Sequence, residues 1–192
     1  MRIGNNYQGI MWLFSKMNGG KTNTGMLFGS GTSAKRSGAG GRNTLEDLLS
    51  GHYKNSYGVE GMCVTGRSDY KKIIPVSDEM KQHVLKDVKM AYYKYNGMSG
   101  DNEAEWDAYY RKNNEYYKTL KKEDRLSACW TLNQLHLGIS KKVTTAIKAE
   151  IPGWTAGKPI PEELLDKIFA DESITSMVSG TSGGTKGIDL QI

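Results

Sequence analysis

SDEMKQHVLKDVKMAYYKYNG, residues 77–97, carries the strongest fold signal of the chain. Ser77 is a favoured helix N-cap, and Asp78 and Glu79 follow in the first turn, where the helix dipole stabilises negative charge. Apolar residues then recur every three or four positions until Gly97, a common residue just past a helix end. These residues are Met80, Val84, Leu85, Val88, Ala91, Tyr92 and Tyr95. The stretch predicts an amphipathic helix with one buried face.

A second helix is expected after Asp101, because Glu103 and Glu105 stand early in the next periodic stretch. One side of this helix carries Trp106, Tyr110, Asn113, Tyr117 and Leu120. Since only residues 97–100 separate the two helices, the pair is predicted to form a helical hairpin.

The remaining elements are shorter or less regular. The residues predicting a more fully buried helix that ends at Gly138 are Leu126, Cys129, Trp130, Leu132, Leu135 and Leu137. The helical period continues through Ile147 until Pro152 and Gly153 interrupt it. Short helices are expected at 43–51 and after Pro161, and short strands around 62–65 and 70–74.

Acidic residues are distributed very unevenly along the chain. Of its 192 residues, 21 are Asp or Glu and 26 are Lys or Arg, and none of the acids precedes Glu46. The first 43 residues carry six basic ones: Arg2, Lys16, Lys21, Lys35, Arg36 and Arg42. The net charge of +5 therefore belongs to this front segment, and the rest of the chain is nearly neutral.

Composition predicts one domain with two extensions. Residues 18–43 are mainly Gly, Ser, Thr and Asn, which bury too little apolar surface to offset the entropy of ordering them. We expect a mainly α protein: a flexible basic arm at 1–43, a compact domain of about five helices at 44–179, and a flexible Gly-rich tail at 180–192.

No span of the chain resembles a membrane helix or a cleaved signal peptide. The longest apolar run near the N-terminus, residues 10–14, is far shorter than the roughly 20 residues needed to cross a bilayer. No membrane partner is therefore expected. A cytoplasmic location is favoured, and export without a cleaved signal stays an alternative.

No motif specifies a reaction, so the sequence leans against an enzyme. The segment ending in Gly20-Lys21-Thr22 lacks the first glycine of a phosphate-binding loop, because Ser15 stands there, and no apolar helix follows. The glycines at 29–34 have the spacing of a dinucleotide-binding motif, but they lie in a predicted linker, so the linker interpretation is favoured. We expect no cofactor.

The histidines and cysteines give no metal-binding pattern, and no metal is expected. His83 and Asp87 are four residues apart on one predicted helix and are interpreted as a solvated pair in preference to a general base. Cys129 is expected in the core. Cys63 is the better candidate for an accessible thiol, although no base can be assigned to it.

Seven of the eleven tyrosines lie between residues 92 and 117, beside several basic residues. Such a pattern can stack nucleic-acid bases, but five acidic residues share the same stretch and would repel phosphates. Packing within the helical hairpin is the favoured interpretation.

A weak amphipathic helix is predicted at 3–17. Its apolar residues recur at spacings of four and three and are Ile3, Tyr7, Ile10, Phe14 and Met17. Because Gly4 and Gly9 lower its helix propensity, the segment is expected to order only when it packs on something. The favoured function is a non-enzymatic protein-interaction or assembly module, with these five residues facing an unidentified partner.

Two alternatives remain for the front segment. The first is nucleic-acid binding, in which Lys16, Lys21, Lys35, Arg36 and Arg42 contact phosphates. The second comes from residues 1–3 and the pair Asn5-Asn6, which with the apolar series resemble the start of flagellin-type secreted axial proteins. That resemblance implies export without a cleaved signal. The family's C-terminal heptad segment has no counterpart here, because the C-terminus is rich in glycine.

Overall fold

The computed structural model of the chain describes residues 46–47, 50, 52–64, 68–98 and 102–179. The chain divides into two units, residues 1–65 and 66–192, and each is described by itself. The predicted boundary at 43/44 falls among residues outside these ranges, and the one at 179/180 lies at their edge. The predicted arm at 1–43 and tail at 180–192 therefore stay predictions.

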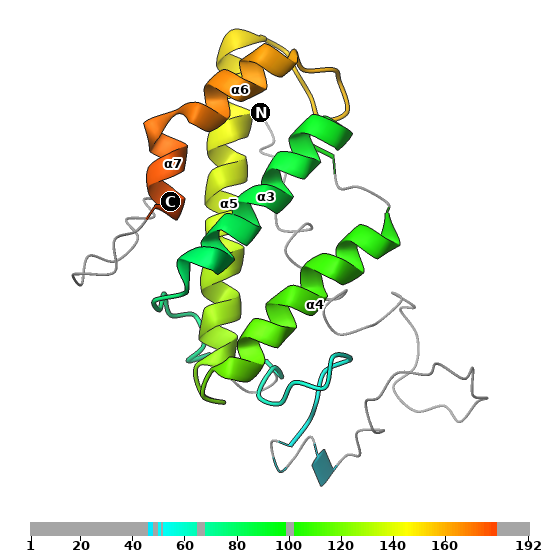
Figure 1. Cartoon of the computed structure of the whole chain (residues 1–192), viewed down its shortest axis with the longest axis vertical. Coiled ribbons are helices and arrows are strands. Elements are labelled where there is room, and N and C mark those ends of the chain that lie inside the picture. The colour runs from blue at the N-terminus through cyan, green and yellow to red at the C-terminus, as the bar shows by residue number, and fades with distance from the viewer. Residues whose placement is uncertain (1–45, 48–49, 51, 65–67, 99–101, 180–192) are drawn as a thin grey trace. The chain divides into compact units, whose positions relative to one another are not determined.

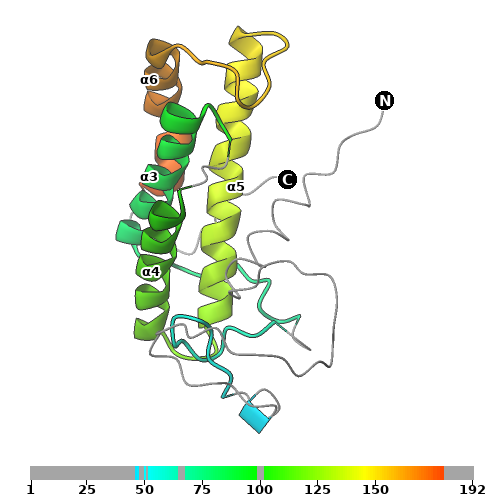
Figure 2. The same ribbon diagram turned by 90° about the vertical axis from the view of Figure 1, so that its right-hand side faces the viewer.

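The described residues are mainly helical and form no strand, which confirms the predicted fold class. Five helices with both ends inside the described ranges lie in the second unit: α3 (Asp78–Tyr95), α4 (Glu103–Thr119), α5 (Arg125–Glu150), α6 (Glu162–Ala170) and α7 (Glu172–Val178). Helix α5 contacts each of the other four. In Figure 2, the other labelled helices lie on one side of α5.

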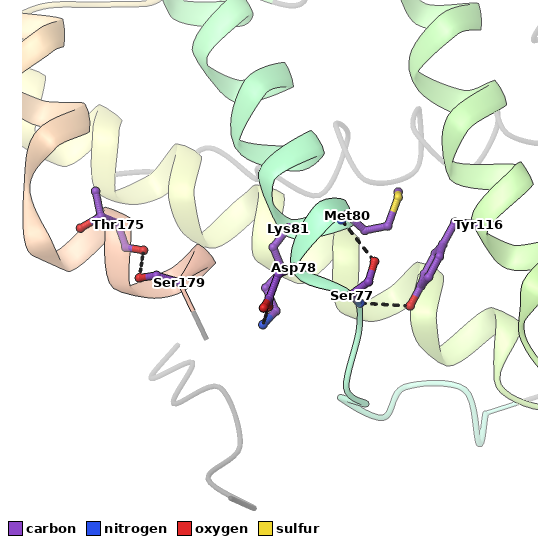
Figure 3. A network of polar contacts seen from close by, with 7 residues as sticks. All are labelled: Ser77, Asp78, Met80, Lys81, Tyr116, Thr175 and Ser179. Carbon is purple, nitrogen blue, oxygen red and sulfur yellow. Dashed lines mark hydrogen bonds and ion pairs between the residues drawn. The ribbon is translucent and has the colours of Figure 1, made fainter. Parts of the chain in front are cut away.

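Helix α3 begins and ends where the sequence predicts. The Met80 amide donates to the Ser77 hydroxyl at 3.3 Å, and Asn96 closes the helix in a left-handed conformation at φ 51°. The Ser77 amide also donates to the Tyr116 hydroxyl on α4 at 3.3 Å, as Figure 3 shows. The start of α3 is thereby tied to the last part of α4.

Helices α3 and α4 form the predicted antiparallel hairpin (Figure 1). Glu79 in the first turn of α3 pairs with Lys112, just past the middle of α4, at 2.8 Å. At the other end, Lys94 pairs with Glu105, which also accepts a hydrogen bond from the Tyr95 hydroxyl at 2.7 Å. Glu79–Lys112 and Lys94–Glu105 are thus contacts between α3 and α4 at two separate levels of the hairpin.

Helix α5 is longer than expected, because Gly138 does not end it. The buried series continues at four-residue spacing through Leu135, Ile139, Val143 and Ile147, all fully buried. A glycine inside a helix costs about 1 kcal/mol relative to alanine, whereas burying each aliphatic side chain contributes about 1.5–3 kcal/mol. The burial of this face outweighs the cost of the glycine.

The predicted strands are wrong for the described residues of both stretches, 62–64 and 70–74. The backbone near residue 74 bonds to a helix instead: the Ile74 amide donates to the Thr131 hydroxyl of α5 at 3.0 Å. In the first unit, an isolated antiparallel bridge joins Lys54 and Glu60 around a turn held by the Asn55 side chain.

The end of the helical unit contains one element that the sequence interpretation missed. The expected helix after Pro161 is α6, and a second short helix, α7, follows it at once. Asp171 separates them and caps α7 by accepting a hydrogen bond from the Ser173 amide at 2.8 Å. Ile174 and Val178 of α7 are buried, so this helix belongs to the core of the helical unit.

Candidate functional site

The predicted partner-facing residues lie outside the described part of the chain. They are Ile3, Tyr7, Ile10, Phe14 and Met17. The residues of the nucleic-acid alternative also lie outside it: Lys16, Lys21, Lys35, Arg36 and Arg42. Both sets stay predictions, and the chemistry described below belongs to the two described units.

The solvated pair predicted for His83 and Asp87 is wrong, because Asp87 is buried and its partner lies on another helix. The Asp87 Oδ2 atom is 3.1 Å from Nε2 of His136 on α5, and the two side chains are 6% and 23% exposed. A buried carboxylate requires such a partner, because desolvation of an unpaired charge is costly. The pair orients the His136 ring and compensates the buried carboxylate.

His83 instead packs against the hairpin partner. Its ring stacks on Tyr109 of α4 at a centroid distance of 4.8 Å, and its Nε2 lies 3.3 Å from the Tyr109 carbonyl. Burial lowers the pKa of His83, and the nearby Lys112 charge acts in the same direction. The imidazole is therefore a neutral packing group near pH 7.

Cys129 lies in the core, as predicted, and its surroundings keep it protonated. The Tyr117 hydroxyl donates to its sulfur, and Nδ2 of Asn133 lies 3.6 Å away. Burial nevertheless raises the pKa of the thiol to about 11. Because the thiolate is the reactive form, Cys129 is a poor nucleophile at neutral pH. Cys63, in the first unit, is half-buried.

The tyrosine-rich stretch packs the hairpin, as expected. Four of its seven tyrosines are buried: Tyr92, Tyr109, Tyr110 and Tyr117. The Tyr92 hydroxyl reaches the Ser140 carbonyl of α5 at 2.9 Å and lies 2.7 Å from the Thr144 hydroxyl. The exposed Tyr93 donates to Asp166 of α6 and stacks on Phe169. These rings join α3 to the neighbouring helices.

Two side chains of α5 are more exposed than the sequence predicts. Leu137 is 38% exposed and Trp130 is only half-buried, although both were expected inside the protein. Seven residues separate them, which is close to two helical turns, so they share one side of the helix. Tyr70 packs nearly perpendicular to the Trp130 ring with 6.0 Å between the ring centroids, and the Lys71 ammonium lies 5.8 Å from the Trp130 centroid.

The same side of α5 continues as a basic surface. We define the α5 strip as Trp130, Gln134, Leu137, Lys141, Thr145 and Lys148, none of which is buried. Glu150 is the only acidic residue of α5, against four basic ones. The sequence shows that residues 125–149 contain no Asp or Glu, which indicates a basic surface. The closely spaced leucines, however, do not show which face of the helix is exposed.

The described residues offer few other candidate sites. Nowhere among them do three or more His, Cys, Asp or Glu side chains gather in a way that could hold a metal ion. No helix within the described ranges has both the length and the apolar character that a membrane crossing demands.

Comparison with known proteins gives a family and no function. A family model described as a domain of unknown function (DUF3879) matches residues 13–192, so the chain belongs to that family. No curated protein and no solved structure matches the chain.

Proposed function

We propose that this chain is a non-enzymatic protein-interaction or assembly module whose segment 3–17 becomes ordered on a partner protein. The observation that carries the proposal is the apolar series Ile3, Tyr7, Ile10, Phe14 and Met17, placed before an acid-free stretch rich in Gly and Ser. A helix this short is marginal alone and gains stability by burying its apolar side.

The packing of the helical unit supports the proposal. Its fully buried side chains come from helices that contact one another, including Val84 and Val88 of α3, Leu132 and Leu135 of α5, and Leu165 of α6. This unit has an apolar core built from its own helices, which supports a role for the apolar residues of 3–17 outside that core.

Deletion of residues 1–43 tests the proposal. The shortened chain is expected to keep its helical circular dichroism and its cooperative unfolding, and to lose the protein that co-purifies with the full chain from the native source. A matched full-length variant replaces Ile3, Ile10 and Phe14 with Ser and should lose the same protein. If the shortened chain unfolds, segment 1–43 is part of the core and the proposal fails.

Nucleic-acid binding is the second candidate, favoured by the six basic and no acidic residues in the first 43. It predicts that the full chain binds single-stranded oligonucleotides, with an affinity that falls steeply with salt and disappears with the deletion. Absence of binding at low salt would eliminate this candidate.

A further inference from the structure

We propose that the α5 strip is a docking surface for an acidic amphipathic segment of a partner protein. The strip is defined above by six residues, and Lys71 and Lys72 lie on the neighbouring segment beside Trp130. None of these residues belongs to 1–43, so the inference does not rest on the proposed function.

The strip faces away from the helical core. The buried residues of α5 recur at Leu135, Ile139, Val143 and Ile147, whereas the strip residues lie on the opposite side of the helix. Figure 2 shows the other labelled helices on one side of α5. The strip therefore remains uncovered by the helices that form the core.

The charge of the surface determines the kind of partner that fits it. Lys141 and Lys148 are exposed on the strip, Lys71 lies against Trp130 at one end of it, and the next residue along the chain, Lys72, is also exposed. Within the described ranges, none of these four ammonium groups has a carboxylate partner, while the single acid of α5, Glu150, pairs with Lys167 at 3.4 Å. A segment that carries Asp and Glu is electrostatically complementary to this surface.

Trp130 and Leu137 supply the apolar anchors. Trp130 is held by Tyr70 and Lys71, so its ring loses little freedom when a partner covers it. The two residues lie about 10 Å apart along the helix axis, the distance between positions i and i+7 of a partner helix. An amphipathic helix with acidic edges matches both the spacing and the charge.

A protein segment fits the strip better than a nucleic acid does. Base stacking requires an open aromatic face, and the Lys71 ammonium already lies over the Trp130 ring. The strip also contains no arginine, the residue best suited to bidentate phosphate contacts. A membrane surface would meet only two apolar side chains along the strip, Trp130 and Leu137.

The test uses the full chain and a fluorescent synthetic helical peptide with Leu on one face and Glu on the other. Fluorescence anisotropy is expected to show binding that weakens as salt rises. The charge reversal Lys141→Glu should weaken binding about threefold to tenfold, and adding Lys148→Glu should weaken it further. Leu137→Ser should reduce the affinity independently of salt.

The matched control is Lys86→Glu, an exposed mid-helix lysine of α3 outside the strip, which should leave binding unchanged. Circular dichroism confirms that each variant is folded. The proposal is overturned if a Leu and Lys peptide binds equally well, or if Lys141→Glu behaves like Lys86→Glu. It is also overturned if an oligonucleotide or anionic vesicle, and not the acidic peptide, binds through these lysines.

Discussion

Asp87 of α3 and His136 of α5 meet inside the helical unit, with 3.1 Å between Oδ2 and Nε2. Because Asp87 is buried, removing the imidazole leaves a carboxylate without compensation. His136→Ala is expected to lower the free energy of unfolding by about 2–4 kcal/mol, measured by urea denaturation. The double variant Asp87→Asn/His136→Ala should recover part of that loss, and an equal or greater loss would contradict this explanation.

Gly97 closes the hairpin end of α3 against the loop that joins α5 to α6. Its φ is +78°, and a Cβ there would lie 2.9 Å from Cη2 of Trp154 and 3.1 Å from Cε1 of Tyr92. Gly97→Ala should therefore destabilise the protein by about 2–4 kcal/mol, through backbone strain and the displacement of a buried ring.

Gly153 provides the matched control for this substitution. Its φ is +79°, but no atom lies within 4 Å of the position of an added Cβ. Gly153→Ala should cost only the backbone strain, about 1–2 kcal/mol. If thermal or urea unfolding gives equal losses for the two variants, the contact with Trp154 contributes nothing.

Alkaline pH should destabilise the protein, because buried Cys and Tyr side chains that stay protonated in the folded state ionise when the chain unfolds. Burial raises the pKa of Cys129 to about 11 and also raises the pKa of Tyr109 and Tyr117. Groups with raised pKa values contribute full stability below their unfolded values, near 9 for Cys and 10 for Tyr, and lose it as pH rises further. The free energy of unfolding should fall above about pH 9.

Tyrosinate absorbance measures this effect directly. The signal of Tyr109 and Tyr117 should appear only with the loss of helical circular dichroism, and Cys129→Ala should shift the onset of the decline upward. Ionisation of these tyrosines in the folded protein would show that their hydroxyls are accessible to water.

Mild acid should destabilise the protein through His83. Burial lowers the pKa of His83 below its ordinary 6.5, so the unfolded chain binds a proton more readily than the folded one. Stability from this group is complete above pH 6.5 and is lost as pH falls toward the folded pKa. His83→Phe preserves a ring against Tyr109 and should flatten the decline below pH 6.5 in denaturation midpoints.

The sequence predicts the helical hairpin well because its signals are local. Ser77 caps α3 from three residues away, and the left-handed Asn96 and Gly97 stop it. The prediction that a helix ends at Gly138 is wrong, because the burial of the surrounding face of α5 outweighs the low helix propensity of glycine, about 1 kcal/mol. The exposure of Leu137 depends on which helices cover α5, which spacing along one helix cannot reveal.

Partners that come from distant parts of the sequence were also missed. Asp87 was assigned to His83, its neighbour one turn away, whereas the structure pairs it with a residue on α5. Residues 70–74 are predicted to form a short strand, whereas the Ile74 amide bonds to the side chain of Thr131. Both choices depend on tertiary contacts between elements that are far apart in sequence.

The contact between Asn96 and Gly157 has a consequence for synthesis on the ribosome. The Gly157 amide donates to the Asn96 carbonyl at 2.9 Å, and Trp154 covers the glycine that follows Asn96. Two whole helices, α4 and α5, are translated between these partners. A nascent chain therefore carries α3 with an uncovered end until the loop after α5 has emerged, and this is the interval in which a chaperone could recognise it.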